Sequence, residues 1–119
     1  MTIVLASAES PAGHAARDYA VEEAKRRDAD LLVFPVDGSS PDPAQFGYDR
    51  VSVQTPDERS KDAVGDLIDM TTRGDIEAVV VGVRRRSPVG KMFLGSSAQQ
   101  IILESGVPVI TVKPAQGEG

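Results

Sequence analysis

Short apolar runs alternate along the chain with longer segments whose apolar residues recur at helical spacing, and this alternation restricts the fold more than any other feature. The runs are TIVLA at 2–6, LLVFPV at 31–36, VSV at 51–53, AVVVGV at 78–83 and VPVITV at 107–112. Continuous apolar strands are typical of a mostly parallel sheet that helices cover on both faces. The 119 residues therefore predict one α/β domain, residues 1–119, built on a five-stranded sheet.

Right-handed crossovers between parallel strands leave few ways to order such a sheet. The order that we expect is 3-2-1-4-5, with its reversal between the strands at 2–6 and 78–83. Ligands of open α/β sheets bind beyond the carboxyl ends of the strands, where the order reverses. Two loops, Ser7–Ser10 and Gly82–Ser97, are therefore the expected binding site.

Helix-start patterns place three helices between the strands. Ser10 and Pro11 are typical of an N-cap and a first helical residue, and they open the first helix. The pattern TPDE at 55–58 is a capping box, which predicts the start of the second helix, and Gly74 is expected to end it. A further box, SSAQ at 96–99, predicts a third helix that ends at Gly106. Residues 37–50 are expected to be a flexible loop and residues 114–119 a frayed tail.

Composition excludes several classes of function. With 18 acidic and 13 basic residues the formal net charge is −5, which argues against binding to nucleic acid or to an anionic membrane. The absence of cysteine excludes disulfides, thiol nucleophiles and cysteine-ligated metals, and one histidine excludes a multi-histidine metal site. No apolar run is long enough to span a membrane and no signal-peptide pattern opens the chain. The sequence predicts a soluble cytoplasmic protein with no metal ligands of its own.

The loop after the fourth strand carries the clearest candidate chemistry. Gly82 ends the strand at a point where the backbone could approach a ligand closely. Gly95, Ser96 and Ser97 open a helix, whose free N–H groups and positive dipole end attract anions. The arginines at 84–86 supply positive charge between them. One interpretation is a phosphate cradle; the other is that the glycine relieves a turn, Ser96 caps the helix and the arginines are solvated. The residues alone leave both open.

The segment GVRRRSPVGKMFLGSSAQQIILESGVPVITVKP at 82–114 resembles the carboxyl end of universal stress proteins. That family carries Gly-x2-Gly-x9-Gly-Ser/Thr there, followed by a helix and a strand of the form x-Pro-Val-x-Val. Gly82, Gly95 and Ser96 match this pattern in spacing, and residues 2–24 resemble the family's first strand and helix. Members usually carry an extra helix where this chain has residues 37–50. The resemblance implies a short member with the Rossmann-like, adenine nucleotide alpha hydrolase-like fold.

The resemblance implies a stress-response regulatory module that binds ATP or another adenine nucleotide, with Mg²⁺ only if ATP binds. Gly82, Gly95 and Ser96 would hold the phosphates and ribose, with Ser97 as a further hydroxyl and Arg84 or Arg85 assisting.

Two positions depart from the family pattern. Arg85 replaces the motif's second glycine, where its side chain could fill the phosphate space or pair with the phosphate. Ala8, between Ser7 and Glu9, stands where the first strand of ATP binders ends in an Asp, so a Mg²⁺ or ribose partner is lost. The alternative is therefore a member that binds no nucleotide and acts through homodimerisation and protein partners.

The last strand is expected at an edge of the sheet, where an uncovered apolar strand favours a self-complementary partner. The resemblance implies an antiparallel homodimer through this strand. The expected interface residues belong to that strand and are Val107, Val109, Ile110, Thr111 and Val112. Val109 and Thr111 should face one side of the sheet, and Ile110 and Val112 the other.

Enzymatic catalysis is the least favoured reading. His14 is the one imidazole that could act as a base, but no Gly-x-Ser-x-Gly elbow accompanies it, and a surface helix residue is the default. A Walker loop is absent, so a fast ATPase is not expected. The strands at 2–6 and 51–53 lack the clustered acids of a phosphoacceptor receiver domain. Asp37, after the second strand, could reach a ribose hydroxyl, but a turn residue before Gly38 is the favoured interpretation.

Overall fold

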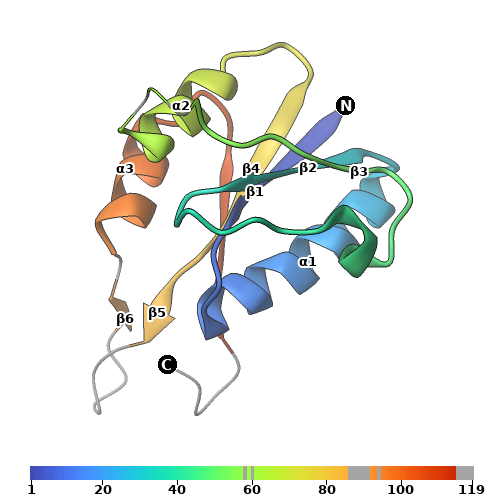
Figure 1. Cartoon of the computed structure of the whole chain (residues 1–119), viewed down its shortest axis with the longest axis horizontal. Helices are drawn as coiled ribbons and strands as arrows, with labels where there is room; N and C mark the ends of the chain where they lie inside the picture. Colours follow the sequence, from blue (N-terminus) through green and yellow to red (C-terminus); the bar gives the residue numbers. More distant parts are fainter. Residues whose placement is uncertain (58, 60, 86–91, 94, 115–119) are drawn as a thin grey trace.

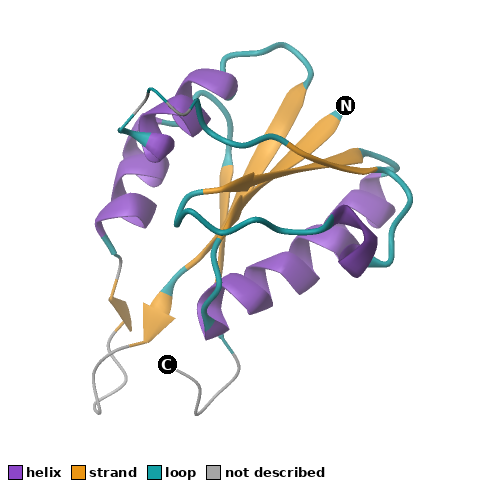
Figure 2. Ribbon diagram, in the orientation of Figure 1, coloured by secondary structure: helices purple, strands orange, loops and turns teal. Residues whose placement is uncertain are grey.

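The computed structural model describes the chain except residues 58, 60, 86–91, 94 and 115–119. The elements follow in the order β1 (Thr2–Ser7), α1 (Pro11–Arg27), β2 (Asp30–Pro35), the 3₁₀ helix η1 (Pro43–Phe46), β3 (Val51–Val53), α2 (Ala63–Met70), β4 (Ile76–Gly82), β5 (Arg84–Arg85), β6 (Met92–Phe93), α3 (Ser96–Glu104) and β7 (Val109–Val112). Five of the strands form one parallel sheet in the order β3-β2-β1-β4-β7 (Figures 1 and 2). This confirms the predicted order and its reversal between β1 and β4.

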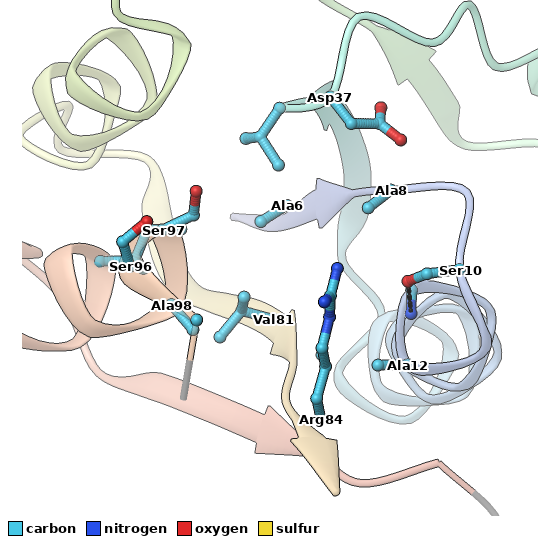
Figure 3. Close-up of a pocket in the computed structure, with 15 residues that line it drawn as sticks. Ala6, Ala8, Ser10, Ala12, Asp37, Val81, Arg84, Ser96, Ser97 and Ala98 are labelled. Atoms are coloured by element: carbon cyan, nitrogen blue, oxygen red, sulfur yellow. Dashed lines mark hydrogen bonds between the residues drawn. The ribbon is translucent and has the colours of Figure 1, made fainter. Parts of the chain in front are cut away.

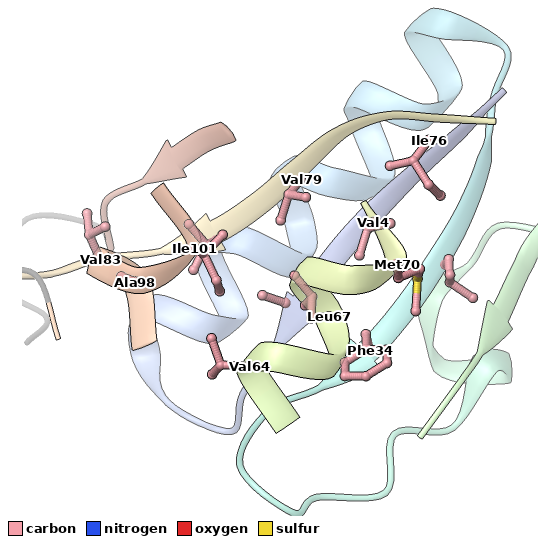
Figure 4. Packing of buried hydrophobic residues seen from close by; sticks show 13 residues of the cluster. Val4, Phe34, Val64, Leu67, Met70, Ile76, Val79, Val83, Ala98 and Ile101 are labelled. Carbon is pink, nitrogen blue, oxygen red and sulfur yellow. The ribbon is translucent and has the colours of Figure 1, made fainter. Parts of the chain in front are cut away.

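Two apolar layers hold the sheet between its helices. Helix α1 covers one face, and α2 and α3 cover the other (Figure 1). Strand β1 is buried throughout and contributes to both layers, since Ile3 and Leu5 pack on the α1 side whereas Val4 and Ala6 pack on the α2 and α3 side. Figure 4 shows Val4 in the layer on the α2 and α3 side. A strand that is covered on both faces needs apolar residues at every position, which explains its continuous apolar run.

Helix α1 begins and ends as its sequence predicts. The Ser10 hydroxyl accepts a hydrogen bond from the Gly13 N–H at 3.0 Å, and Pro11 is the first helical residue. Most of the buried residues of the helix have small side chains, and these include Ala12, Ala16, Ala20 and Ala24. Such small side chains let the helix axis lie close to the sheet. The close approach brings the start of α1 against the ends of β1 and β4.

The predicted start of α2 is wrong. The helix begins at Ala63, and Asp62 is its N-cap, accepting from the Gly65 N–H at 2.9 Å. The TPDE pattern at 55–58 ends in Glu58, which lies outside the described residues. Residues 55–62 contain no aliphatic or aromatic side chain that could be buried, so helix formation there has no tertiary support. The helix also ends at Met70, before Gly74, with Thr71 as its C-cap.

Other boundaries also differ from the sequence prediction. Gly95, not a serine, is the N-cap of α3, and the helix ends at Glu104 rather than near Gly106. Residues 37–50 contain η1, and the two-residue strands β5 and β6 pair antiparallel after β4, neither of which the sequence predicted. Strand β7 covers residues 109–112 of the expected 107–112, and the tail 115–119 lies outside the described residues.

Candidate functional site

A cavity of about 340 Å³ opens beyond the carboxyl ends of β1 and β4, at the predicted point of strand reversal (Figure 3). Its walls come from the loop after β1, the start of α1, the residues after β2, the end of β4, β5 and the start of α3. The lining residues are Ala6, Ala8, Ser10, Ala12, Gly13, Val36, Asp37, Val81, Gly82, Arg84, Gly95, Ser96, Ser97, Ala98 and Ile101. Of the predicted site residues, Gly82, Arg84, Gly95, Ser96, Ser97 and Ala8 are therefore brought together here.

The start of α3 forms an open wall of this cavity. The N-cap Gly95 has an extended backbone, and no side chain provides a capping hydrogen bond. A Cβ atom built on Gly95 would meet no atom of the described part of the chain within 4 Å. Ser96 and Ser97 are exposed, and Figure 3 shows both hydroxyls at the cavity. Because the first N–H groups of a helix have no partner within it, this wall offers N–H and O–H donors and the positive end of the helix dipole.

Arg84 supplies the positive charge of the cavity. Its side chain extends from β5 toward Ala6 and Ala8 (Figure 3). Among the described residues no carboxylate pairs with its guanidinium. The arginine can therefore donate to an anion without first breaking an ion pair. The backbone of Arg85 pairs with Met92, but its side chain lies outside the described residues, so its predicted contact with phosphate stays a prediction.

Gly82 is required by packing within the protein. A Cβ atom on Gly82 would overlap the carbonyl oxygen of Ala12, which lies directly over the end of β4. Gly13 is similarly constrained, because its Cβ would overlap the carbonyl oxygen of Ala8. The sequence predicted that a ligand could approach Gly82 closely. In the structure the group that approaches is the Ala12 carbonyl of helix α1, and a ligand contact at Gly82 stays a prediction.

Asp37 forms the wall that follows β2. Its Oδ2 accepts from the Glu9 N–H at 2.8 Å, and its Oδ1 accepts from the Ser39 N–H at 3.1 Å and the Ser39 hydroxyl at 2.6 Å. Partial burial raises the pKa of this carboxyl, but the hydrogen bonds from Ser39 and Glu9 outweigh it, and the net pKa is lowered from 3.8. Asp37 is thus the turn residue that the sequence favoured and a lining residue as well.

Comparison with known proteins identifies the family to which the chain belongs. The model of the universal stress protein family matches residues 48–113. The chain belongs to the universal stress protein family. It is similar to a universal stress protein of Mycolicibacterium smegmatis, with 36% identity over 94% of this chain and 97% of the relative.

Solved universal stress proteins share the fold. One structure from Archaeoglobus fulgidus has a TM-score of 0.73 at 26% identity and covers 94% of this chain and 97% of that one. UspA from Lactobacillus plantarum has a TM-score of 0.69 at 16% identity, with 94% and 97% covered. A further Archaeoglobus fulgidus structure, described as a complex with dAMP, has a TM-score of 0.66 at 22% identity, with 94% and 96% covered. The family and the Rossmann-like fold that the sequence predicted are both confirmed.

The predicted site residue Ser7 of this universal stress protein, and the histidine His14, do not line the cavity. Ser7 is 7% exposed and does not line it; its carbonyl accepts from the Val36 N–H at 3.0 Å. His14 lines a small neighbouring recess, where its Nε2 lies 2.9 Å from Oε2 of Glu9. The ring is therefore held at the rim by a carboxylate on the loop after β1.

Sequence reasoning missed the apolar part of the cavity. Val36, Val81, Ala98 and Ile101 line it between the polar walls. Their positions in the sequence could have indicated this, because Val36 follows the end of β2 and Val81 precedes Gly82 at the end of β4. Across the described residues, no group of three or more His, Cys, Asp and Glu side chains could hold a metal ion. Within the same residues no helix is long and apolar enough to cross a membrane.

Proposed function

We propose that this universal stress protein is a regulatory module that binds an adenine nucleotide in the cavity beyond β1 and β4. The observation that carries the proposal is the open start of α3, where no atom of the described residues fills the space beside Gly95 and no side chain caps the helix N–H groups. Phosphate oxygens accept from such N–H groups and from serine hydroxyls. The phosphate end of the nucleotide would therefore lie against Gly95, Ser96 and Ser97.

The remaining walls suit the rest of such a ligand. Arg84 supplies a cation that can form paired hydrogen bonds with a phosphate group. Val36 and Val81 offer apolar surface to a purine ring. The Archaeoglobus fulgidus protein described as a complex with dAMP supports an adenine ligand, because it shares this fold.

Mg²⁺ enters this proposal only as a companion of ATP. Ala8 lines the cavity at the position where the family resemblance implies an Asp, so the loop after β1 places no carboxylate there. The carboxylate of Asp37 lies on the wall opposite Arg84. The ion would therefore be held by the phosphate groups themselves. We assign no hydrolytic step to the site, and turnover, if measured, should be slow.

Calorimetric titration of the purified, nucleotide-stripped protein with ATP and with AMP, each with and without Mg²⁺, tests the proposal. Binding in the micromolar range should weaken about tenfold or more in the double variant Gly95→Ala and Ser96→Ala, since a methyl group then occupies the phosphate space and a donor is lost. Matched controls are Gly74→Ala, whose Cβ also meets nothing within 4 Å, and Ser52→Ala on exposed β3. Absence of heat at millimolar nucleotide would overturn the proposal and favour a member that acts through protein partners.

We also propose that the protein forms a homodimer through β7. This strand pairs with β4 on one side and is the edge of the sheet. The carbonyls of Pro108 and Val112 accept from β4, so strand alternation directs the backbone groups of Val109 and Thr111 to the free edge. Val109 packs with the α2 and α3 side, and Ile110 and Val112 pack with the α1 side, as the sequence predicted. Half-buried Val107, just before the strand, adds apolar surface.

Light scattering at micromolar concentration tests the dimer. Thr111→Pro removes an N–H that faces the free edge and should give a monomer, whereas Thr111→Val keeps the N–H and should stay dimeric. A wild-type protein that is monomeric would contradict the proposal. The cytoplasmic location that the sequence predicts belongs to the same proposal and is checked by cell fractionation.

A further inference from the structure

Asp37 and Arg84 occupy opposite walls of the candidate site. Asp37 follows β2 and Arg84 follows β4, so the end of β1 lies between them in the sheet. Figure 3 shows this arrangement, with Ala6 and Ala8 between the carboxylate and the guanidinium. Neighbouring strands are about 4.8 Å apart, which places the backbones of the two walls roughly 10 Å apart. A ligand that contacts both walls needs an anionic group at one end and hydrogen-bond donors at the other.

The carboxylate of Asp37 is fixed in position before any ligand arrives. Three donors from Glu9 and Ser39 hold it at 2.6–3.1 Å, and the bond from the Glu9 N–H joins the loop after β2 to the loop after β1. An ionised carboxylate accepts about four hydrogen bonds. Within the described residues Oδ1 has two donors and Oδ2 has one, the Glu9 N–H. Oδ2 can therefore accept a further bond without losing its present partner.

Charge excludes one orientation of the ligand. Asp37 forms no ion pair with any described cation and lies on the cavity wall as an anion. A phosphate placed beside it would be repelled, whereas a phosphate beside Arg84 is attracted. A neutral part of the nucleotide that carries hydrogen-bond donors then faces Asp37. Sugar hydroxyls are donors of the kind that such a carboxylate binds at the end of a second strand in other nucleotide folds.

We propose that Asp37 accepts a hydrogen bond from a ribose hydroxyl, so that the site selects ribonucleotides over deoxyribonucleotides. This inference rests on the proposed nucleotide-binding function and adds a specificity-determining residue to it. The free lone pair of Oδ2 and the position of Asp37 opposite Arg84 carry the inference. A turn residue with no ligand contact would produce no discrimination between sugars.

Calorimetry with AMP, 2′-deoxyAMP and 3′-deoxyAMP on the nucleotide-stripped protein tests the assignment. The wild type should bind AMP about tenfold more tightly than at least one deoxy analogue, since a hydrogen bond to a charged group is lost. Asp37→Asn should lower AMP affinity about tenfold and leave that analogue within about twofold, because asparagine can keep the turn while the charge is removed.

Asp42→Asn is the matched control. Asp42 is also exposed and also accepts from the backbone N–H two residues on, that of Ala44 at 3.0 Å, but it does not line the cavity. It should leave all three affinities unchanged. Equal wild-type affinity for the three nucleotides, or an equal loss with every nucleotide in Asp37→Asn, would overturn the role of Asp37 and leave nucleotide binding intact. No binding of any nucleotide would overturn both proposals.

Discussion

Helices α1 and α3 begin at the same cavity but begin in opposite ways. The start of α1 is closed by its own chain: Ser10 caps it, Pro11 has no N–H to satisfy, and the backbone of the loop after β1 packs against Gly13. The start of α3 has neither a side-chain cap nor a neighbouring atom near Gly95. Both starts are rich in small residues, so composition alone does not separate them.

The difference separates the glycines that packing requires from the one that leaves open space in the cavity. Gly13 and Gly82 sit under carbonyl oxygens, so the protein itself excludes a side chain there. Gly95 meets no such exclusion, so its small size leaves space that a ligand can occupy. A motif glycine can therefore be assigned to packing or to binding only when its surroundings are known.

The largest effect is expected from a substitution where α1 packs tightly against the end of β4. Gly82→Ala should lower the free energy of unfolding by about 3 kcal/mol, because the new methyl group overlaps the Ala12 carbonyl and α1 must shift. Gly95→Ala should change it by less than about 0.5 kcal/mol. Urea unfolding of both variants measures the contrast. Equal stability losses at the two positions would contradict the distinction between them.

A capping side chain at the start of α3 should weaken nucleotide binding and stabilise the fold. Gly95→Asp supplies a carboxylate that can cap α3, and the extended backbone at this position accepts any residue. We expect AMP affinity to fall more than tenfold by charge repulsion, while the free energy of unfolding rises by a few tenths of a kcal/mol. Calorimetry and urea unfolding on the same sample report both. Unchanged AMP affinity would remove the start of α3 from the binding site.

Removal of a serine hydroxyl should affect the two helices differently. Ser10→Ala loses the bond to the Gly13 N–H and should cost about 1 kcal/mol of stability. Ser96→Ala loses no cap and should leave stability within about 0.5 kcal/mol. Thermal unfolding followed by circular dichroism compares them. A larger loss for Ser96→Ala than for Ser10→Ala would reverse our assignment of the two starts.

The smallest effect concerns pH. Asp37 has a folded pKa below its ordinary value of 3.8, so its hydrogen bonds stabilise the fold fully above that value. This contribution is lost as the pH falls through the folded pKa, and it is small because the side chain is exposed. The stability difference between wild type and Asp37→Asn should be constant from pH 5 to 7 and shrink below 3.8. A difference that grows on acidification would have the wrong sign.

The sequence predicted the sheet better than the helix starts. Buried strands such as β1 and β4 leave a continuous apolar run, which is a strong and local signal. The start of α2 was placed at Thr55 because a capping pattern is local too, whereas the helix begins at Ala63, where apolar packing begins. A capping pattern indicates that a helix could begin at a residue, but a helix forms there only when packing of its apolar face stabilises it.

Only part of the candidate site could be predicted, because the sequence shows local patterns but not which loops lie side by side. Gly95 and Ser96 were found through spacing and family resemblance and Arg84 through its charge, and all three line the cavity. For Asp37 a turn role was favoured over a ribose contact, because the sequence does not show that the loop after β2 lies beside the loop after β1. The hydrogen bond from the Glu9 N–H to Asp37 creates that proximity, and it joins residues 28 positions apart.

The open position at Gly95 also makes the protein convenient to observe. The chain contains no cysteine, so Gly95→Cys would introduce a single thiol whose Cβ meets no other atom within 4 Å. A fluorophore attached there would sit at the rim of the cavity on a helix start that the fold does not constrain. Because the label would itself fill the space beside the start of α3, the rate at which the thiol reacts with it, and not its emission, would report whether a bound molecule already covers this position.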